Sequence, residues 1–379
     1  EIAQCLVGSE MCIRDRSGND GVGIAKFLSY GNGADLTVID LLEYLKTDAE
    51  TKVIALYLES VKDGRAFMEA VKQAALVKPV VVVKSGRSSM GQRAAMSHTG
   101  AMAGSDAVFD AALKQCGAIR VDTLKELFEV CKGFSLMPPM EGRKIAIVTN
   151  SGGPGVMTTD RADKLNMQVP ETSPEIRTAL AEFLPAYAGM KNPVDITVEG
   201  TGEQYGRAAQ TMLQEMDGSV VIYVGTPYLQ SMPVAEQIVA SSKSVGKPVC
   251  AVMQVGTDVT ESIAYLQANG IPCYEIGEDA AFVLEKMAAY SEWKQSAGDA
   301  SCFAAAEPEG KLFETSNRLL EPEAMALLQK NGIPVPDYAF VRTREEAMAA
   351  AVARDTELVM KVVSPQIIHK SDVGGVILH

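Results

Sequence analysis

Cysteine is sparse in this chain, and long apolar runs are missing. The seven cysteines are an odd number, and no two of them form a CxxC pair. This pattern excludes a disulfide framework and a zinc site of the usual spacing, and it is typical of a protein in the reducing cytoplasm. No stretch approaches the roughly 18 apolar residues that a membrane span needs, and no secretory signal is visible. Because the chain begins with Glu1, we expect its natural start to lie upstream.

Positive charge is also in short supply. Lys and Arg total 35 against 48 Asp and Glu, which gives a formal net charge of −13 and a pI of about 4.9. This balance disfavours nucleic acid and anionic membranes as partners. A ligand that carries phosphate must then be held by backbone amides and a few placed cations. Histidine occurs three times, as His98, His369 and His379.

Apolar material, in contrast, is plentiful. With 379 residues and 47% hydrophobic side chains, the chain is long enough for two or three domains of about 150 residues each. The linker over 296–318 is rich in Ala, Ser and Gly, and two prolines interrupt a helical stretch near 136–144. These breaks predict units over 17–138, 142–295 and 319–379. The last unit is predicted to begin with a helix, a short strand and a second helix.

Two of these units repeat the same order of elements. In the first, a buried strand over 51–59 ("TKVIALYLE") precedes a helix over 63–77 and a strand that starts at Lys78 ("KPVVVVKSG"). In the second, "GSVVIYVGT" over 218–226 precedes a helix over 234–246 and a strand that starts at Lys247 ("KPVCAVMQVG"). Strands that are apolar throughout and alternate with helices predict parallel sheets covered on both faces. The sequence therefore predicts a duplicated, flavodoxin-like α/β unit.

The two copies differ in length at one place. Between Lys78 and Gly117 there are 39 positions, but between Lys247 and Gly270 there are 23. The first copy thus holds an insertion of about 16 residues, which contains "GRSSMGQRAAMSHTGAMA" and with it His98. Long loops of this kind are often functional, although a solvated surface loop is the alternative.

Glycine-rich turns follow strands in both copies. "TNSGGPG" over 149–155 ends a strand and opens a helix, and the loop after His98 also gives way to a helix. The free N–H groups at a helix N-terminus favour anions, but a turn without any ligand is the alternative. A histidine beside such a turn suggests an imidazole that takes up a phosphoryl group.

Four motifs in this order resemble one family. They are "SHTGAMAGSDAVFDAALKQCGAIRV", "TNSGGPGVMTTD", "NPVDI" and "VMKVVSPQIIHKSDVGGV". The chain resembles the NDP-forming (ADP-forming) acyl-CoA synthetases, or acetate–CoA ligases, which are related to succinyl-CoA synthetase. The resemblance implies two flavodoxin-like ligase domains followed by the start of an ATP-grasp domain. It also implies a CoA-binding domain missing upstream and an ATP-grasp domain cut short after its first strands.

The resemblance implies roles for particular residues. His98 matches the phosphohistidine that relays phosphate between an acyl phosphate and ADP, and Glu59 matches the carboxylate that orients it. Phosphate would lie between two helix N-termini, one flanked by Ser97, Thr99 and Gly100, the other opened by Asn150, Ser151, Gly152, Gly153 and Gly155. The alternatives are a surface histidine for His98 and a solvated carboxylate at a strand end for Glu59.

The third unit carries the nucleotide part of the resemblance. Lys361, on a predicted strand, matches a lysine that contacts the nucleotide phosphates, and we expect this cation to be buried. Lys370 and Ser371 lie in the same loop as His369, which matches a second histidine that helps to carry phosphate. A loop histidine that contacts only nucleotide or a carboxylate is the alternative for His369. Cofactors implied are ATP or ADP, Mg²⁺ with ligands beyond residue 379, and coenzyme A as a substrate.

Three segments receive a lesser role or none. The first sixteen residues, including "CLVGSEMCIRDR", have no visible place in the repeat, so we expect no structural role for residues 1–16. In "SYGNGAD" over 29–35, Asn32 and Asp35 match a segment near the family's acyl site, but a simple turn is favoured. His379, as the last residue, receives no role.

Three functions remain after this reading. The favoured one is a ligase that converts acyl-CoA, ADP and phosphate into a carboxylate, ATP and CoA through a phosphohistidine, acting on small molecules and assembling as a dimer or larger homo-oligomer. The alternative is a non-catalytic module that senses acyl-CoA within a protein lysine acetyltransferase. A nicotinamide-dependent dehydrogenase is disfavoured because "NSGGPGVMTTD" lacks the G-x-G-x-x-G spacing.

Overall fold

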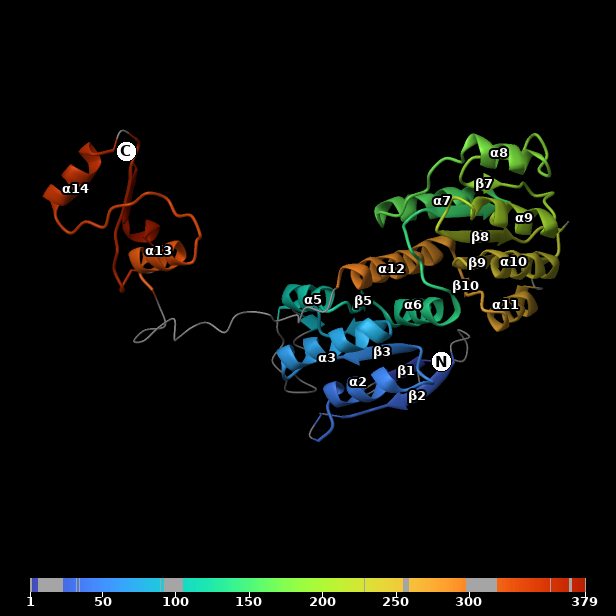
Figure 1. Ribbon diagram of the computed structural model, residues 1–379, viewed down its shortest axis with the longest axis horizontal. Helices are drawn as coiled ribbons and strands as arrows, with labels where there is room; N and C mark the ends of the chain where they lie inside the picture. Colours follow the sequence, from blue (N-terminus) through green and yellow to red (C-terminus); the bar gives the residue numbers. More distant parts are fainter. Residues whose placement is uncertain are drawn as a thin grey trace. The chain divides into compact units, whose positions relative to one another are not determined.

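The computed structural model describes residues 2–5, 23–31, 33, 35–88, 90–91, 105–227, 229–254, 259–297, 319–354, 356–367 and 370–378, with the backbone alone for 2–5. The chain divides into two compact units, Glu1–Phe303 and Ala304–His379 (Figure 1). Within these ranges, no helix has both the length and the apolar character that crossing a membrane requires.

The first unit contains two parallel sheets of five strands each. The first sheet has the order β2-β1-β3-β4-β5 and the second the order β10-β9-β8-β6-β7, so both follow the flavodoxin order, in which the first strand lies between the second and the third. The predicted fold class and duplication are confirmed. The strands are β1 (Ile2–Cys5), β2 (Ile24–Leu28), β3 (Val53–Leu58), β4 (Val80–Lys84), β5 (Ile119–Val121), β6 (Ile145–Thr149), β7 (Val194–Asp195), β8 (Gly218–Val224), β9 (Val249–Gln254) and β10 (Cys273–Tyr274).

One expectation about the start of the chain is wrong. Ile2–Cys5 forms β1, which pairs in parallel with both β2 and β3. The reason lies in the flavodoxin order, which requires a strand at this place in the sheet, as β6 provides in the second copy. Residues 6–16 of the same segment lie outside the described residues.

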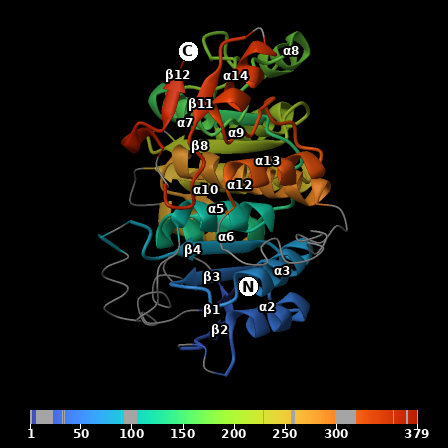
Figure 2. The ribbon, with the colours of Figure 1, turned by 90° about the vertical axis from the view of Figure 1, so that its left-hand side faces the viewer.

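The two copies share one apolar core. Helices α6 (Leu124–Leu136) and α12 (Gly277–Ser296) contact each other between the two sheets, α6 against β3 and β4 and α12 against β8 and β9 (Figures 1 and 2). Alternate residues of the strands, such as Val53 of β3 and Val220 of β8, are fully buried in this core. Because both sheets bury one face against the same pair of helices, the two copies form one body.

Separate helices cover the outer faces. The outer core of the first sheet includes side chains from α2 (Val38–Thr47), α3 (Gly64–Val77) and α5 (Asp106–Gln115). That of the second sheet includes side chains from α8 (Pro174–Ala181), α9 (Gly202–Met212), α10 (Ser231–Val245) and α11 (Val259–Ala268), while α7 (Gly152–Lys164) packs against α12. Both faces of each sheet are therefore buried, as the apolar strands predict.

The connection between the copies takes part in the packing. Helix α6 ends at Leu136, before the two prolines, as predicted. Pro138 and Pro139 are exposed, but Met137 and Met140 on either side are buried in the shared core. This segment is therefore an anchored connection between the two sheets.

The second unit is small. It contains α13 (Glu321–Lys330), α14 (Arg344–Val352), the 3₁₀ helix η1 (Ser371–Val373) and an antiparallel pair, β11 (Val359–Lys361) with β12 (Val376–Leu378). The short strand that the sequence predicts between the two helices is absent from residues 333–342. Pro334 and Pro336 account for this, since proline has no N–H to donate to a neighbouring strand.

Candidate functional site

The turn after β6 is held by its own side chains. Thr149 ends the buried strand, and its Oγ1 accepts a hydrogen bond from the Ser151 N–H at 3.0 Å and donates one to the Ser151 carbonyl at 2.9 Å. Ser151 is the N-cap of α7, with an extended backbone, and within the described part of the chain its side chain makes no capping hydrogen bond. The first N–H groups of α7 therefore keep no side-chain acceptor from the N-cap residue.

Asn150 joins this turn to the next strand. Its Nδ2 donates to the carbonyl of Val224 and its Oδ1 accepts from the Val224 N–H, both at 2.9 Å. Asn150 is 2% exposed. The side chain predicted to bind phosphate is thus engaged with the backbone at the end of β8, where it fixes the place at which α7 begins.

The glycines of the turn serve different needs. A side chain at Gly155 would approach Thr149 Cγ2 at 3.2 Å and Pro193 Cβ at 3.4 Å, so this glycine allows the helix to lie close to the strand ends. A side chain at Gly153 would meet no described atom within 4 Å. Gly152 and Gly153 are exposed, and the first turn of α7 contains no acidic residue. This helix end is open to an approaching anion.

The "NPVDI" motif braces the same turn. The side-chain amide of Asn192 accepts from the Ile147 N–H at 3.0 Å and donates to the Ile145 carbonyl at 2.8 Å, so it pairs with β6 like another strand. Asp195 accepts from the Thr197 N–H at 2.9 Å, and its other carboxylate oxygen lies 3.7 Å from the place where a side chain on Gly152 would begin. The motif thereby puts a carboxylate beside the first turn of α7.

A second group of charged residues lies at the carboxyl edge of the first sheet. Glu59 directly follows β3, and Lys84, the last residue of β4, donates from Nζ to the Glu59 carbonyl at 2.8 Å. Asp106, the first residue of α5, forms an ion pair with Arg120 at 2.6 Å and a longer one with Arg87 at 3.7 Å. These contacts tie the start of α5 to the ends of the neighbouring strands.

Several predicted site residues lie outside the described residues. They are Ser97, His98, Thr99 and Gly100 of the insertion, His369 of the second unit, and Asn32 of the "SYGNGAD" segment. Asp35 is exposed, and the Gly33 N–H donates to the Tyr30 carbonyl at 3.1 Å in a turn where Gly31 and Gly33 are left-handed. The described part of that segment is therefore a turn, the interpretation that the sequence favours.

Two predicted lysines of the second unit meet at one carboxylate. Lys361 pairs with Glu321 at 3.3 Å, and Lys370 pairs with the other oxygen of Glu321. The expectation that Lys361 is buried is wrong, since its side chain is 46% exposed on a strand that this unit leaves open. Ser371 begins η1 next to Lys370. A pocket of about 270 Å³ is lined by Glu321, Ser364, Lys370 and apolar neighbours. The described residues contain no cluster of His, Cys, Asp and Glu fit to hold a metal ion.

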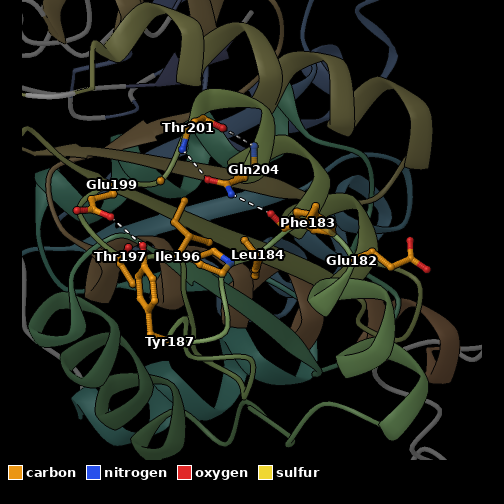
Figure 3. A pocket seen from close by; sticks show the side chains of 11 residues that line it. Glu182, Phe183, Leu184, Tyr187, Ile196, Thr197, Glu199, Thr201 and Gln204 are labelled. Atoms are coloured by element: carbon orange, nitrogen blue, oxygen red, sulfur yellow. Dashed lines mark hydrogen bonds between the residues drawn. The ribbon is translucent and has the colours of Figure 1, made fainter.

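A larger pocket, of about 410 Å³, lies at the end of β7 and is not lined by any of the predicted residues (Figure 3). The Tyr187 hydroxyl donates to Glu199 at 2.7 Å on one side of it, and Gln204 donates to the Phe183 carbonyl on the other. Thr197 has a φ of +68°, which is unusual for a β-branched residue, and its buried Oγ1 has no hydrogen-bond partner among the described residues. Sequence patterns carry no signal for this pocket, because two separate loops form it.

Family models match three successive parts of the chain. Residues 9–134 match the succinyl-CoA ligase like flavodoxin domain, residues 145–300 the Ligase-CoA domain and residues 311–379 the ATP-grasp domain. The order is the one that the four motifs imply. The chain belongs to the ADP-forming acyl-CoA synthetase family.

Known members of the family align with most of the chain. The chain is 37% identical to 4-hydroxybutyrate–CoA ligase [ADP-forming] of Nitrosopumilus maritimus, over 94% of this chain and 52% of that protein. It is 41% identical to the alpha subunit of acetate–CoA ligase [ADP-forming] II of Pyrococcus furiosus, over 69% of this chain and 58% of that protein. The chain thus spans between 52% and 58% of these two curated relatives.

A solved structure of the family has the same fold. The dinucleotide forming acetyl-coenzyme A synthetase 1 of Ca. Korarchaeum cryptofilum, in complex with phosphate and ADP, superposes with a TM-score of 0.74 at 30% identity, covering 78% of this chain and 65% of that one. These relatives are ligases, and they give no support to the alternative of a regulatory acetyltransferase module.

Proposed function

We propose that the protein containing this chain is an acid–thiol ligase that converts acyl-CoA, ADP and phosphate into a carboxylate, ATP and CoA. The proposal rests on the family and on the names of its relatives, which are ADP-forming CoA ligases. ATP or ADP is the proposed nucleotide and CoA the proposed thiol substrate. We further propose a cytoplasmic location, since Cys116, Cys131, Cys250 and Cys273 are free thiols.

The proposed mechanism proceeds in three steps. Phosphate displaces CoA from the thioester and gives an acyl phosphate. A nitrogen of His98 then attacks the phosphorus, the bond from phosphorus to the acyl oxygen breaks, and the carboxylate leaves. Finally an oxygen of ADP takes the phosphoryl group from the imidazole, which gives ATP and returns His98 to its starting form.

One observation carries this mechanism best. The insertion that contains His98 leaves the first sheet directly after Lys84 and returns at α5, so both of its ends lie at the charged edge that holds Glu59 and Asp106. In the second copy, the open N-terminus of α7 has Gly152 and Gly153 exposed for phosphate. Backbone amides and a few cations are the devices that an acidic protein needs to hold a phosphoryl group.

For the nucleotide, we propose Lys361, Lys370 and Ser371. The two ammonium groups both form ion pairs with Glu321, so they lie close to each other. Two cations at this spacing can bind neighbouring phosphate groups of a nucleotide. Mg²⁺ would supply charge neutralisation on those phosphates. His369 is proposed to help transfer the phosphoryl group to this site.

Labelling with γ-³²P-ATP tests the mechanism in the full-length protein. The wild type is expected to give an acid-labile, base-stable phosphoprotein, because a phosphoryl group on an imidazole nitrogen has these stabilities. The His98→Ala variant is expected to give no label. Label that persists in this variant would exclude His98 as the phosphorylated residue. The His369→Ala variant, labelled in a parallel experiment, separates the role of His369 from that of His98.

The assembly of the enzyme is also a proposal. One relative is named as an alpha subunit, so members of the family occur with their parts on separate chains. We propose that the full-length protein assembles as a homodimer or larger oligomer. Light scattering at several protein concentrations would measure its mass.

A further inference from the structure

Lys84 holds the carboxyl end of the central strand in the first sheet. Its Nζ donates to the carbonyls of Glu59, at 2.8 Å, and Ser85, at 2.6 Å. The ammonium group also lies 5.6 Å from the centre of the Phe109 ring on α5. One cation thus contacts the end of β3, the start of the inserted loop and the helix to which that loop returns.

The duplicated sheet shows which of these features the fold itself requires. Counted from the Lys-Pro pair that directly precedes both β4 and β9, Lys84 corresponds to Met253, which is 6% exposed. The strand registers, Leu58 with Lys84 and Tyr223 with Met253, make Glu59 correspond to Val224. The second copy therefore builds the same sheet with apolar residues at both positions where the first copy has charges.

The second copy also fixes the end of its central strand, but without a charge. There the neutral amide of Asn150 binds the N–H and the carbonyl of Val224, the counterpart of Glu59. A neutral hydrogen-bond donor therefore suffices to hold this strand end. The ammonium group of Lys84 adds a positive charge that the sheet does not need.

The surroundings keep this charge in a partly buried and strongly charged environment. Burial is the main cause that lowers the pKa of Lys84 below its ordinary value, and Arg120 on β5 lowers it further. The carboxylates of Asp106 on α5 and Glu59 after β3 act in the opposite direction. Burying an ammonium group is costly, and the neutral Asn150 at the matching place in the second copy shows that holding this strand end does not require one.

We propose that Lys84 is a positioning residue for phosphoryl transfer, which fixes Glu59 at the end of β3 and keeps a positive charge at the strand end from which the inserted segment leaves. The inference rests on the proposed function, in which Glu59 orients His98. A fixed positive charge at this edge stabilises the dianionic phosphoryl group on the histidine relative to the unphosphorylated imidazole. If Glu59 were displaced, its carboxylate could no longer orient the imidazole ring of His98.

Three variants of the full-length protein separate charge from hydrogen bonding. Lys84→Arg keeps both, while Lys84→Gln keeps a neutral donor and removes the charge. Lys78→Gln is the matched control, because Lys78 lies just before the other end of the same strand. It donates to the carbonyls of Leu45 and Asp48, and its pKa is likewise lowered mainly by burial. The measurement is the initial rate of phosphoenzyme formation from γ-³²P-ATP as a function of pH, together with the melting temperature.

The expected results differ between the variants. Lys84→Gln should slow phosphoenzyme formation about 100-fold, as loss of a placed charge does, while Lys84→Arg should slow it less than about tenfold. Lys78→Gln should match Lys84→Gln in lost stability and leave the rate unchanged. In the wild type, the rate should decline at alkaline pH as Lys84 loses its proton, and Lys84→Arg should move this decline to higher pH because arginine stays charged.

The outcomes that overturn the proposal are equally distinct. The proposal is wrong if Lys84→Gln leaves the rate unchanged, or if Lys84→Gln and Lys78→Gln lose the same amount of rate. It is also wrong if the decline of the rate at alkaline pH stays at the same pH in Lys84→Arg. If Lys84→Gln does not fold, the comparison of the wild type with Lys84→Arg over pH decides alone. A wild type that takes up no label overturns the phosphohistidine mechanism itself, so the two failures are distinguishable.

Discussion

Asn150 and Asn192 show what single polar side chains do at the edge of the second sheet. Both are buried, and each amide binds one backbone N–H and one backbone carbonyl, on β8 and β6 respectively. A side-chain amide has the same donor and acceptor pair as a peptide group, so it can complete a strand ladder. The glycine-rich turn is therefore held in place by amides on both sides.

Replacement of Asn150 tests this role. Asn150→Ala leaves the Val224 N–H and carbonyl without their partner, and we expect the free energy of unfolding to fall by about 2–3 kcal/mol. Urea unfolding followed by circular dichroism measures the change. Ser151→Ala is the control, because the Ser151 side chain makes no capping hydrogen bond within the described chain, and its effect should stay below about 0.5 kcal/mol. Equal effects of the two variants would contradict the role of Asn150.

The residue scale also shows where sequence reasoning was incomplete. Asn150 stands in a recognisable motif, but its partner Val224 lies 74 positions away, and no local pattern connects the two. The proximity of Lys84 to Glu59 likewise depends on the pairing of β3 with β4. Such pairs become visible once the strand order is known.

At the scale of elements, α6 and α12 carry a partly buried group of charges between the two copies. Lys125 of α6 contacts Asp279 of α12 at 2.6 Å and Glu129 of its own helix at 3.3 Å. Burial, followed by repulsion from Asp279, raises the pKa of Glu129 to about 7, although Lys125 and Lys132 act against this shift. We therefore expect the stability of this contact to depend on pH near neutrality.

The sign of this pH effect follows from the raised pKa. The Glu129 carboxyl group binds its proton more tightly in the folded protein than in the unfolded chain, where the pKa is about 4.5. Its contribution to stability is therefore full below pH 4.5 and is lost as the pH rises through 7. We expect Glu129→Gln to raise the free energy of unfolding above pH 7 by about 2 kcal/mol and to leave it nearly unchanged at pH 4.5.

Thermal unfolding over a pH series measures this difference. Glu275→Gln is the matched control, because Glu275 also contacts Lys125 but its side chain is 81% exposed. A Glu275→Gln profile that changes as much as that of Glu129→Gln would show that burial is not the cause.

Most elements were predictable, because each long apolar strand and its helix follow from local periodicity. The strand expected before α14 was not formed, since prolines at 334 and 336 interrupt it, and the strand at Ile2–Cys5 was missed. The missed strand could not have been found by local pattern. It is recognised only from the sheet, because the flavodoxin order requires a strand between β2 and β3.

At the scale of the whole molecule, two aromatic residues near the end of α12 contact the first copy. A side chain added at Gly117, before β5, would lie 2.3 Å from Trp293 on α12, and Gly117 has a φ of +77°. Tyr290 on the same helix donates its hydroxyl proton to the Ala75 carbonyl of α3 at 2.6 Å. The end of α12 is therefore fastened to the first sheet through these two aromatic residues.

Gly117→Ala should disrupt the contact between Gly117 and Trp293. We expect a loss of about 3 kcal/mol in the free energy of unfolding, because the added methyl group displaces the indole ring as well as straining the backbone. Trp293 is the one tryptophan of the chain, so its fluorescence should shift to the red. Gly246→Ala is the control, since Gly246 has a similar φ of +68° but open space around it, and it should cost about 1 kcal/mol with unchanged fluorescence. A fluorescence spectrum unaltered by Gly117→Ala would refute the contact.

Fold class, duplication and the order of the domains can all be predicted from the residues alone, because they follow from apolar periodicity, from glycine and proline signals and from motifs that stay contiguous along the chain. Three features become visible only in the folded chain: the two copies share one core, Lys361 is exposed, and Lys84, Glu59 and Asp106 meet at one edge. The physical reason is that burial and electrostatic environment depend on which distant segments pack together, and the packing of two sheets on the same helices is not encoded in any single stretch of residues.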